Sequence, residues 1–496
     1  MHKHRRQGDL LATLAGGIAV FSFSPFNIWP VMACSVGVLF TVLNEQPMRT
    51  VARRSWLFGA GLFGAGISWV YVSIHSFGGA SAPMAAGLTL VFVSLLSAVF
   101  VVPAGMVYAH LAQRQRLWKK VLLFSGVWVL FEWLRSSFLT GLPWLYSGYT
   151  LLDTPFSGLA PVTGVYGLGL LVVMAGTVAS ALAVRPKEPG LYCVGLAVIV
   201  VAGCAAALRE QRWTEPLPQP PITFSAVQGN ISQALKWEPD HLNKTINTMQ
   251  TLSAGHWHKD LLLWPENAIP TSVNWLPGLV ADLSERAQRH KTALILGAPQ
   301  SIDQTWYNSL AAWGRAQGRY FKQKLVPFGE FVPFESVLRG LISLFDLPMS
   351  SFTAGPTSQP GITFDGLPIA TFICYEIVYP DFVAAMAMDS AFLLTVSNDT
   401  WFGTSIGPEQ HFQMVRMRSL ETGRYQLRAT NNGITALIDD RGRVVSQAPR
   451  DQQAVLEGQM PLTVGSTPFM RYHSWPVLLL ALLLILPSAL GRRQDD

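Results

Sequence analysis

The chain has 496 residues, of which 50% are hydrophobic and only 13% are charged, and its formal net charge is +6 at pH 7. Soluble domains carry about 25% charged residues, so this composition excludes an ordinary soluble protein and indicates a membrane protein. The short connections between the apolar runs contain many basic and few acidic residues. The positive charge therefore reflects membrane topology and gives no support to nucleic-acid binding.

Uncharged apolar runs predict eight membrane-spanning helices. Residues 10–43 form one long run, which Ser24-Pro25-Phe26-Asn27 divides into two spans joined by a tight turn. The further runs lie at about 56–74, 84–109, 121–139, 158–184, 190–208 and 475–490. Seven spans thus form a membrane domain over residues 1–208, and an eighth lies at 474–491.

Lys and Arg in the connections predict the orientation of these spans. The N-terminus, the loops at 44–55, 112–120 and 185–189, and the C-terminus are basic. The alternate turns near 24–27, 75–83 and 140–157 contain no Lys or Arg. Because basic connections stay on the cytoplasmic side, both termini are predicted to be cytoplasmic and residues 209–473 non-cytoplasmic.

The polar stretch after the seventh span predicts an α/β layered domain. Residues 209–221 form a linker that is rich in proline, and the domain follows at 222–467. Strands are predicted at 222–228, 261–264, 293–296, 309–313, 369–374, 392–396 and 434–439, and helices at 241–254, 279–290, 379–388 and 409–423. This alternation is typical of layered α/β folds.

Three polar side chains of this domain suggest acyl-transfer chemistry. Cys374 is the only cysteine between Arg209 and His473 and ends an apolar run, so it is either a nucleophile or a small buried filler. Glu266 ends another apolar run, and Lys322 precedes Leu-Val-Pro-Phe-Gly-Glu. A carboxylate, an ammonium and a thiol supply the base, the electrostatic stabiliser and the acyl acceptor that amide and thioester chemistry needs.

Trp264-Pro-Glu266, Lys322 and Cys374-Tyr-Glu376 resemble, in order and spacing, the Glu-Lys-Cys triad of the nitrilase (carbon–nitrogen hydrolase) superfamily. The resemblance covers about 220–460 and implies a four-layer αββα sandwich. The whole layout, with seven spans before the domain and one after, resembles the apolipoprotein N-acyltransferases of the bacterial inner membrane. That family implies a periplasmic catalytic domain, a phospholipid acyl donor and a diacylated apolipoprotein acceptor.

The resemblance also implies roles for individual residues. Cys374 is the nucleophile, Glu266 the base and Lys322 the oxyanion stabiliser; Lys324 competes with Lys322, but counting back from Phe328-Gly-Glu330 selects Lys322. Glu330 supports Lys322 or the leaving group, and Tyr375 and Glu376 either line the site or orient the turn at Cys374. Further positions that match the family's motifs are Asn308, Trp237 and Trp401, of which Trp401 could equally be a core aromatic.

Several alternatives stay open. A membrane-tethered amidase that hydrolyses an amide or ester is the second interpretation, whereas the spans lack the buried ionisable residues that a transporter needs. His256, His258 and His411 have no further ligands at metal-binding spacing, so no metal and no cofactor is expected. The apolar segment 334–349 is either a lid that dips into the bilayer or a plain core helix.

Overall fold

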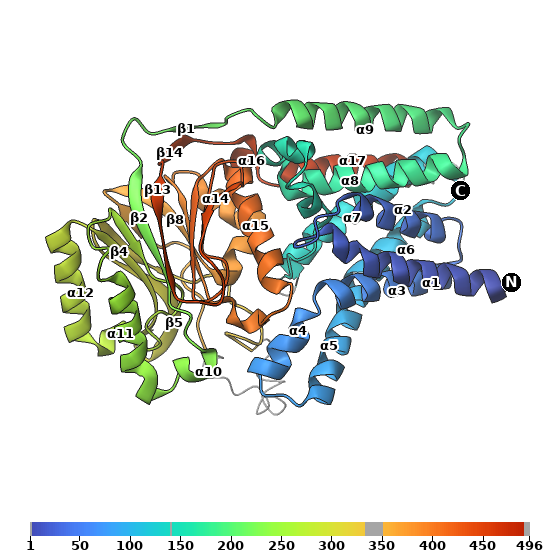
Figure 1. Ribbon diagram of the computed structural model, residues 1–496. Coiled ribbons are helices and arrows are strands. Elements are labelled where there is room, and N and C mark those ends of the chain that lie inside the picture. The colour runs from blue at the N-terminus through green and yellow to red at the C-terminus, as the bar shows by residue number, and fades with distance from the viewer. Residues whose placement is uncertain (1, 139–140, 333–350, 491–496) are drawn as a thin grey trace. The chain divides into compact units, whose positions relative to one another are not determined.

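The computed structural model describes residues 2–138, 141–332 and 351–490, so the predicted lid or core helix at 334–349 lies outside the described residues. The chain forms two compact units (Figure 1). The first comprises Met1–Tyr71, Ala82–Gln211 and Tyr472–Asp496, and the second comprises Val72–Ser81 and Arg212–Arg471.

Apolar helices build the first unit. They are α1 (His2–Ile18), α2 (Pro30–Leu43), α3 (Met48–Gly66), α4 (Trp69–Val72), α5 (Ala82–Leu96), α6 (Val102–Leu111), α7 (Leu117–Ser137), α8 (Ala160–Val184), α9 (Pro189–Leu208) and α17 (Trp475–Leu490). Proline occupies the first turn of α2, α6, α8 and α9, where its missing N–H breaks no helical hydrogen bond. The break between α1 and α2 confirms the predicted division of residues 10–43.

The predicted count of eight spans is not confirmed by the lengths and compositions of these helices. Among the described residues, three helical stretches are long and apolar enough to cross a membrane: Ala82–Leu111, Pro155–Val184 and Pro189–Leu208. A fourth results if Met48–Gly66 and Trp69–Phe77, which meet at a 56° bend, form one span. Helices lie at every predicted place, but α2 and α17 fall short of this length.

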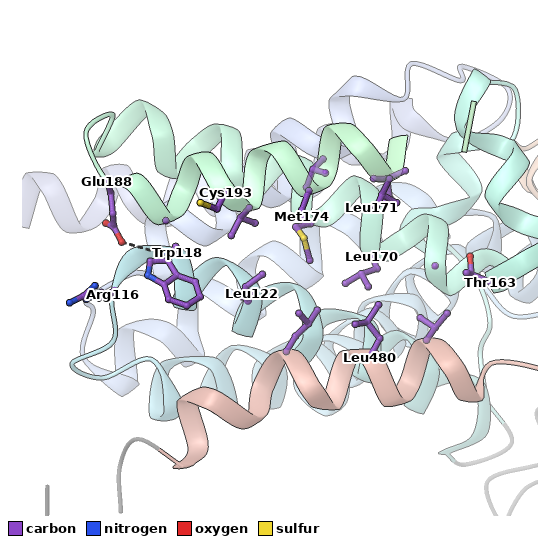
Figure 2. A pocket seen from close by; sticks show the side chains of 18 of the residues that line it. Arg116, Trp118, Leu122, Thr163, Leu170, Leu171, Met174, Glu188, Cys193 and Leu480 are labelled. Carbon is purple, nitrogen blue, oxygen red and sulfur yellow. Dashed lines mark hydrogen bonds between the residues drawn. The ribbon is translucent and has the colours of Figure 1, made fainter. Parts of the chain in front are cut away.

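Helices α7, α8, α9 and α17 border a groove of about 990 Å³ within the first unit (Figure 2). Its walls are mostly aliphatic, and charged side chains from the ends of α7 and α8 lie at one end.

A twelve-stranded sheet forms the centre of the second unit, in the order β12-β11-β10-β9-β8-β7-β6-β5-β4-β3-β2-β13. Its strands are β2 (Ile222–Gln228), β3 (Leu261–Leu263), β4 (Ala293–Ile302), β5 (Thr305–Gly314), β6 (Ala316–Phe321), β7 (Gly361–Phe364), β8 (Leu367–Ile373), β9 (Leu393–Ser397), β10 (Gln426–Thr430), β11 (Ala436–Ile438), β12 (Val444–Gln447) and β13 (Ala454–Met460). The seven predicted strands are confirmed, whereas β6, β7, β10, β12 and β13 were not predicted.

The two halves of this sheet face each other across one core. Residues of β2 to β5 and of β8 to β10 share a buried cluster that includes Phe224, Leu263, Leu310, Ile373, Leu394 and Leu427. The helices α11 (Leu242–Ser253) and α12 (Pro277–His290) cover one outer face, and α14 (Pro380–Ala387) and α15 (Gly407–Thr422) cover the other (Figure 1). These four helices confirm the four that the sequence predicts. Because the two halves of one sheet pack against each other and helices cover both outer faces, the unit has four layers in the order helix, sheet, sheet, helix.

Parallel pairing brings the candidate residues to the carboxyl ends of buried strands. Strands β2, β3 and β4 are parallel in one half of the sheet, and β8, β9 and β10 are parallel in the other. Glu266 follows β3, Cys374 follows β8 and Asn398 follows β9. Strands buried on both faces are continuously apolar, so the first polar residue after each strand lies at the sheet edge where ligands bind in such folds.

Two features complete the second unit at its chain ends and with a segment from the N-terminal part of the sequence. Strand β1 (Thr214–Pro216) pairs with β14 (Thr463–Gly465), which joins its two chain ends. The segment Val72–Ser81 contains a π-helical turn, Ser73–Phe77, that packs on the second unit. Ser73 Oγ donates to the Trp401 carbonyl oxygen at 2.8 Å, and the Phe77 ring meets Trp401 edge-on at 5.9 Å.

Candidate active site

Cys374 occupies a strained turn at the end of β8. Its φ of 53° lies in the left-handed region, which is uncommon for a residue with a β-carbon and is frequent at functional sites. The chain enters a 3₁₀ turn, Cys374–Val378, directly after the strand. Cys374 as a residue is partly exposed, whereas its neighbours Ile373 and Tyr375 are buried.

Glu266, Lys322, Glu330 and Asn308 form a single buried polar network. Lys322 Nζ lies 3.6 Å from Glu266 Oε1 and 2.8 Å from Glu330 Oε2. Asn308 Nδ2 donates to Glu266 Oε1 and to Glu330 Oε1, both at 2.8 Å. All four residues are at most 5% exposed. The structure therefore brings together four of the predicted site residues, and one amide bridges the two carboxylates.

The charges of this network favour a neutral thiol beside an available base. Burial raises the pKa of the Cys374 thiol, the Glu266 carboxylate raises it further, and Lys322 opposes this shift. Burial of Lys322 disfavours its ammonium form, but the carboxylates of Glu330 and Glu266 outweigh it and raise its pKa. With both carboxylates ionised, two negative charges face one positive charge, so one carboxylate has no ion-pair partner of its own in the network.

The two candidate lysines differ in burial. Lys322 is 1% exposed, whereas Lys324 is exposed and places its ammonium 5.6 Å from the centre of the Tyr379 ring. Strand β6 ends at Phe321 and the chain bends at residues 323–324, so the two lysines do not lie on one extended strand. Among the two, only Lys322 contacts Glu266 and Glu330.

Glu376 lies behind the turn and holds the backbone. Its carboxylate accepts hydrogen bonds from Ile373 N at 2.8 Å and from Gln323 N at 2.6 Å, and also from Tyr320 Oη at 2.8 Å. Burial raises the pKa of Glu376 to about 7, although these donors oppose the shift. The geometry matches the alternative in which Glu376 orients the turn, and Tyr375 packs edge-on against Tyr379 at 5.4 Å.

The two tryptophans lie on neighbouring loops. Trp237 follows the short helix α10 (Gln233–Lys236), and its buried indole nitrogen has no hydrogen-bond partner among the described residues. Trp401 lies in the 3₁₀ turn Asp399–Phe402 and contacts Phe77. No hydrogen bond or ring contact within the described residues joins either tryptophan to Glu266, Lys322 or Cys374.

Two further residues hold Glu266 and were not predicted. The backbone N–H of Asn398 donates to Glu266 Oε2 at 2.8 Å, and Lys236 Nζ donates to the Glu266 carbonyl oxygen at 3.2 Å. Burial lowers the pKa of Lys236 to about 8, against the opposing effect of the Glu266 carboxylate. Asn398 follows a buried strand, as Glu266 and Cys374 do, so the same strand-end signal identifies it.

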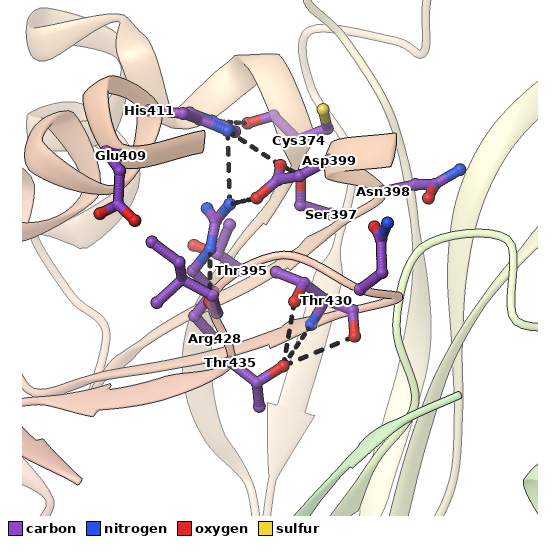
Figure 3. Close-up of polar contacts among 12 residues, drawn as sticks. Cys374, Thr395, Ser397, Asn398, Asp399, Glu409, His411, Arg428, Thr430 and Thr435 are labelled. Carbon is purple, nitrogen blue, oxygen red and sulfur yellow. Dashed lines mark hydrogen bonds and ion pairs between the residues drawn. The ribbon is translucent and has the colours of Figure 1, made fainter. Parts of the chain in front are cut away.

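A second buried network supports the turn from the opposite side (Figure 3). His411 Nε2 lies 3.3 Å from the Cys374 carbonyl oxygen, and His411 Nδ1 lies 3.3 Å from Arg428 Nη2. Burial, reinforced by Arg428, lowers the pKa of His411, so the ring is neutral. His411 Nδ1 also lies 3.2 Å from Asp399 Oδ1, and the Cys374 carbonyl can only accept, so Nε2–H is the donor to the turn. Asp399 binds Arg428 at 2.7 Å.

Comparison with known proteins gives matches over both parts of the chain. Residues 15–178 match the family model described as apolipoprotein N-acyltransferase N-terminal domain, and residues 223–468 match that of carbon-nitrogen hydrolase. An apolipoprotein N-acyltransferase of Pseudomonas syringae pv. tomato is 42% identical over 96% of this chain and 95% of its own length. One of Coxiella burnetii is 37% identical over 96% of this chain and 99% of its own.

Solved structures resemble the second unit more distantly. A carbon-nitrogen hydrolase from Helicobacter pylori is 15% identical, covers 52% of this chain and 94% of its own, and gives a TM-score of 0.39. An amidase from Nesterenkonia is 15% identical, covers 50% of this chain and 92% of its own, and gives a TM-score of 0.36. At these scores the similarity carries no argument about the site.

Proposed function

The chain belongs to the apolipoprotein N-acyltransferase family, and on this premise we propose that it works in two half-reactions through an acyl thioester on Cys374. The enzyme is an acyltransferase of lipoprotein maturation. The donor in this proposal is a phospholipid, and the acceptor is the α-amino group of a diacylglyceryl-cysteine at the N-terminus of an apolipoprotein. The observation that carries it is the buried Glu266–Asn308–Glu330–Lys322 network beside the thiol.

In the first half-reaction the Cys374 sulfur attacks the carbonyl carbon of a phospholipid ester. The thiol proton passes to Glu266, because the raised pKa of Cys374 requires a base at the moment of attack. The Lys322 ammonium stabilises the tetrahedral oxyanion. The carbon–oxygen bond of the ester then breaks, Glu266 returns the proton to the leaving oxygen, and a lysophospholipid departs from the acyl thioester.

In the second half-reaction the α-amino nitrogen of the acceptor attacks the thioester carbonyl. A carbon–nitrogen bond forms, the carbon–sulfur bond breaks and an amide results. Glu266 accepts the proton that the amine loses, and the thiol is restored. Glu330 and Asn308 hold Lys322 and Glu266 in place, and Glu376 and His411 hold the turn that presents the sulfur.

We also propose the full topology. Eight spans, both termini in the cytoplasm and a periplasmic catalytic domain inserted between α9 and α17 agree with the alternating basic connections. The division into residues 1–208, 209–221, 222–467 and 474–491 belongs to this proposal. A catalytic domain tethered to the bilayer lets both lipid substrates react without leaving the membrane, which is costly for a diacyl lipid.

An assay with purified enzyme tests this function. A phospholipid labelled in one acyl chain is mixed with a synthetic diacylated lipopeptide, and the label is followed into lipopeptide amide, free fatty acid and protein. We expect label in the amide and, without acceptor, on the Cys374 peptide. A Cys374→Ala variant controls for labelling elsewhere. Label released only as fatty acid would instead identify a membrane-tethered hydrolase.

A further inference from the structure

The groove in the first unit is too apolar to hold water and too large to stay empty. Its walls include Leu122, Leu170, Met174, Ala197 and Leu480, and its volume of about 990 Å³ lies at the upper end of the ~300–1,000 Å³ of ligand pockets. Water enters a cavity only where polar groups hold it, and an empty space of this size forfeits dispersion contacts on every wall. The groove is therefore suited to bind apolar chains.

Lipid tails are the apolar chains available to this helical unit. Helix α9 is apolar along its length, and most of its surface, including Leu196 and Ile199, is exposed. Together with α8 it passes the length and composition test for a membrane span. A lateral gap beside such a helix is open to the bilayer, so acyl chains can enter it from the side.

One end of the groove carries a charged rim (Figure 2). Arg116 and Trp118 come from the start of α7, and Arg185 and Glu188 come from the loop between α8 and α9. Glu188 Oε1 accepts a hydrogen bond from the Trp118 backbone N–H at 3.2 Å. Two arginines and one carboxylate leave this rim net positive, and Trp118 is the residue type found where membrane meets water.

Both arginines are available to a ligand. Arg116 is exposed and forms no ion pair within the described part of the chain. Arg185 Nη2 lies 3.7 Å from Glu45 Oε1, but both side chains are more than half exposed. Exposed pairs of this kind contribute little, so a phosphate can replace Glu45 at low cost.

We propose that the groove binds one anionic phospholipid, with its acyl chains along α8 and α9 and its phosphate against Arg116 and Arg185. Basic pockets between membrane helices on the cytoplasmic side bind anionic lipid head groups. The assignment to the cytoplasmic leaflet rests on the proposed topology, whereas the site itself rests on the groove and its rim. The lipid is a resident ligand that takes no part in the chemistry at Cys374.

Two cysteines of α9 provide a built-in probe. Cys193 lines the groove, whereas Cys204 does not, and both are exposed. The full-length protein in detergent is delipidated and titrated with phosphatidylglycerol or with phosphatidylcholine of identical acyl chains. Maleimide labelling of each cysteine is then read by peptide mass. We expect phosphatidylglycerol to protect Cys193 at lower concentration than phosphatidylcholine does, and to leave Cys204 unchanged.

Charge and shape are tested separately. Each arginine near a lipid surface changes affinity about fivefold, so Arg116→Gln with Arg185→Gln weakens phosphatidylglycerol protection about 25-fold. Ala197→Trp fills the groove and abolishes lipid-dependent protection, while Leu196→Trp, on the exposed side of the same helix, does not. Equal protection by both lipids in the wild type, or a phosphatidylglycerol preference that survives in the double arginine variant, overturns the proposal.

Discussion

Replacing Lys322 by methionine keeps the length of the side chain and removes its ammonium. The two oxygens of Glu330 lie 2.9 and 2.8 Å from that ammonium, and the nearest oxygen of Glu266 lies 3.6 Å away. Breaking a buried ion pair costs about 3–5 kcal/mol, because the carboxylates are left buried without their cation. Loss of one oxyanion donor slows acyl transfer about 10²–10³-fold. Lys322→Met is therefore expected to lose both stability and rate.

A second substitution separates these two effects. Glu330→Gln in the Lys322→Met background removes one of the two carboxylates, so the net charge of the network returns from −2 to the −1 of the wild type. We expect the double variant to regain most of the unfolding temperature in detergent. It should not regain the rate of Cys374 acylation, because no cation faces the developing oxyanion.

The assay follows acylation of Cys374 by intact mass after addition of phospholipid, at equal concentrations of folded enzyme. Lys324→Met is the matched control, since this lysine is exposed and its contact with the Tyr379 ring is worth about 0.5–1 kcal/mol. A double variant that acylates within tenfold of the wild type would refute the reasoning, because Lys322 would then serve charge balance alone.

Three further predictions follow from the same site. Glu266→Gln blocks formation of the thioester as well as its transfer; if intact mass finds this variant fully acylated in membranes, another base takes the first proton. Because burial raises the pKa of Cys374, its rate of alkylation by iodoacetamide rises about tenfold per pH unit from pH 7 to 9, and a plateau near neutral pH contradicts a neutral thiol. His411→Leu leaves the Cys374 carbonyl oxygen unpaired, at a cost of about 1–3 kcal/mol, and slows acylation of Cys374. His411→Gln places an N–H near the Nε2 position and retains most of the rate. Equal acylation rates for both variants rule out the positioning role.

Apolar runs that end in a polar residue made much of the site predictable from the sequence. Glu266 and Cys374 follow strands that are buried on both faces, so each strand is a continuous apolar run with a clear end. Lys322 has no such signal, because it follows β6, whose sequence Ala-Gln-Gly-Arg-Tyr-Phe is not a continuous apolar run. Only its spacing from Phe328-Gly-Glu330 distinguishes it from Lys324.

The parts that were missed depend on contacts between distant segments. Strand β10 reads Gln-Leu-Arg-Ala-Thr and is fully buried, although two of its side chains are strongly polar. Arg428 is tolerated there because the Asp399 carboxylate pairs with its Nη2 and the Ile434 carbonyl accepts from its Nε. Neither a periodic pattern nor a local propensity identifies such a strand, since its polar partners come from other parts of the chain.

The contact of the turn Ser73–Phe77 with Trp401 has a consequence for engineering. A gene fragment that starts at Arg212 and stops at Arg471 encodes all strands of the sheet but omits Val72–Ser81, which belongs to the same compact unit. The fragment would present Trp401 without Phe77, and a bare surface at Gly403 where Val72 now packs. A water-soluble version for screening inhibitors thus calls for grafting this decapeptide back, or for a hydrophilic replacement of Trp401.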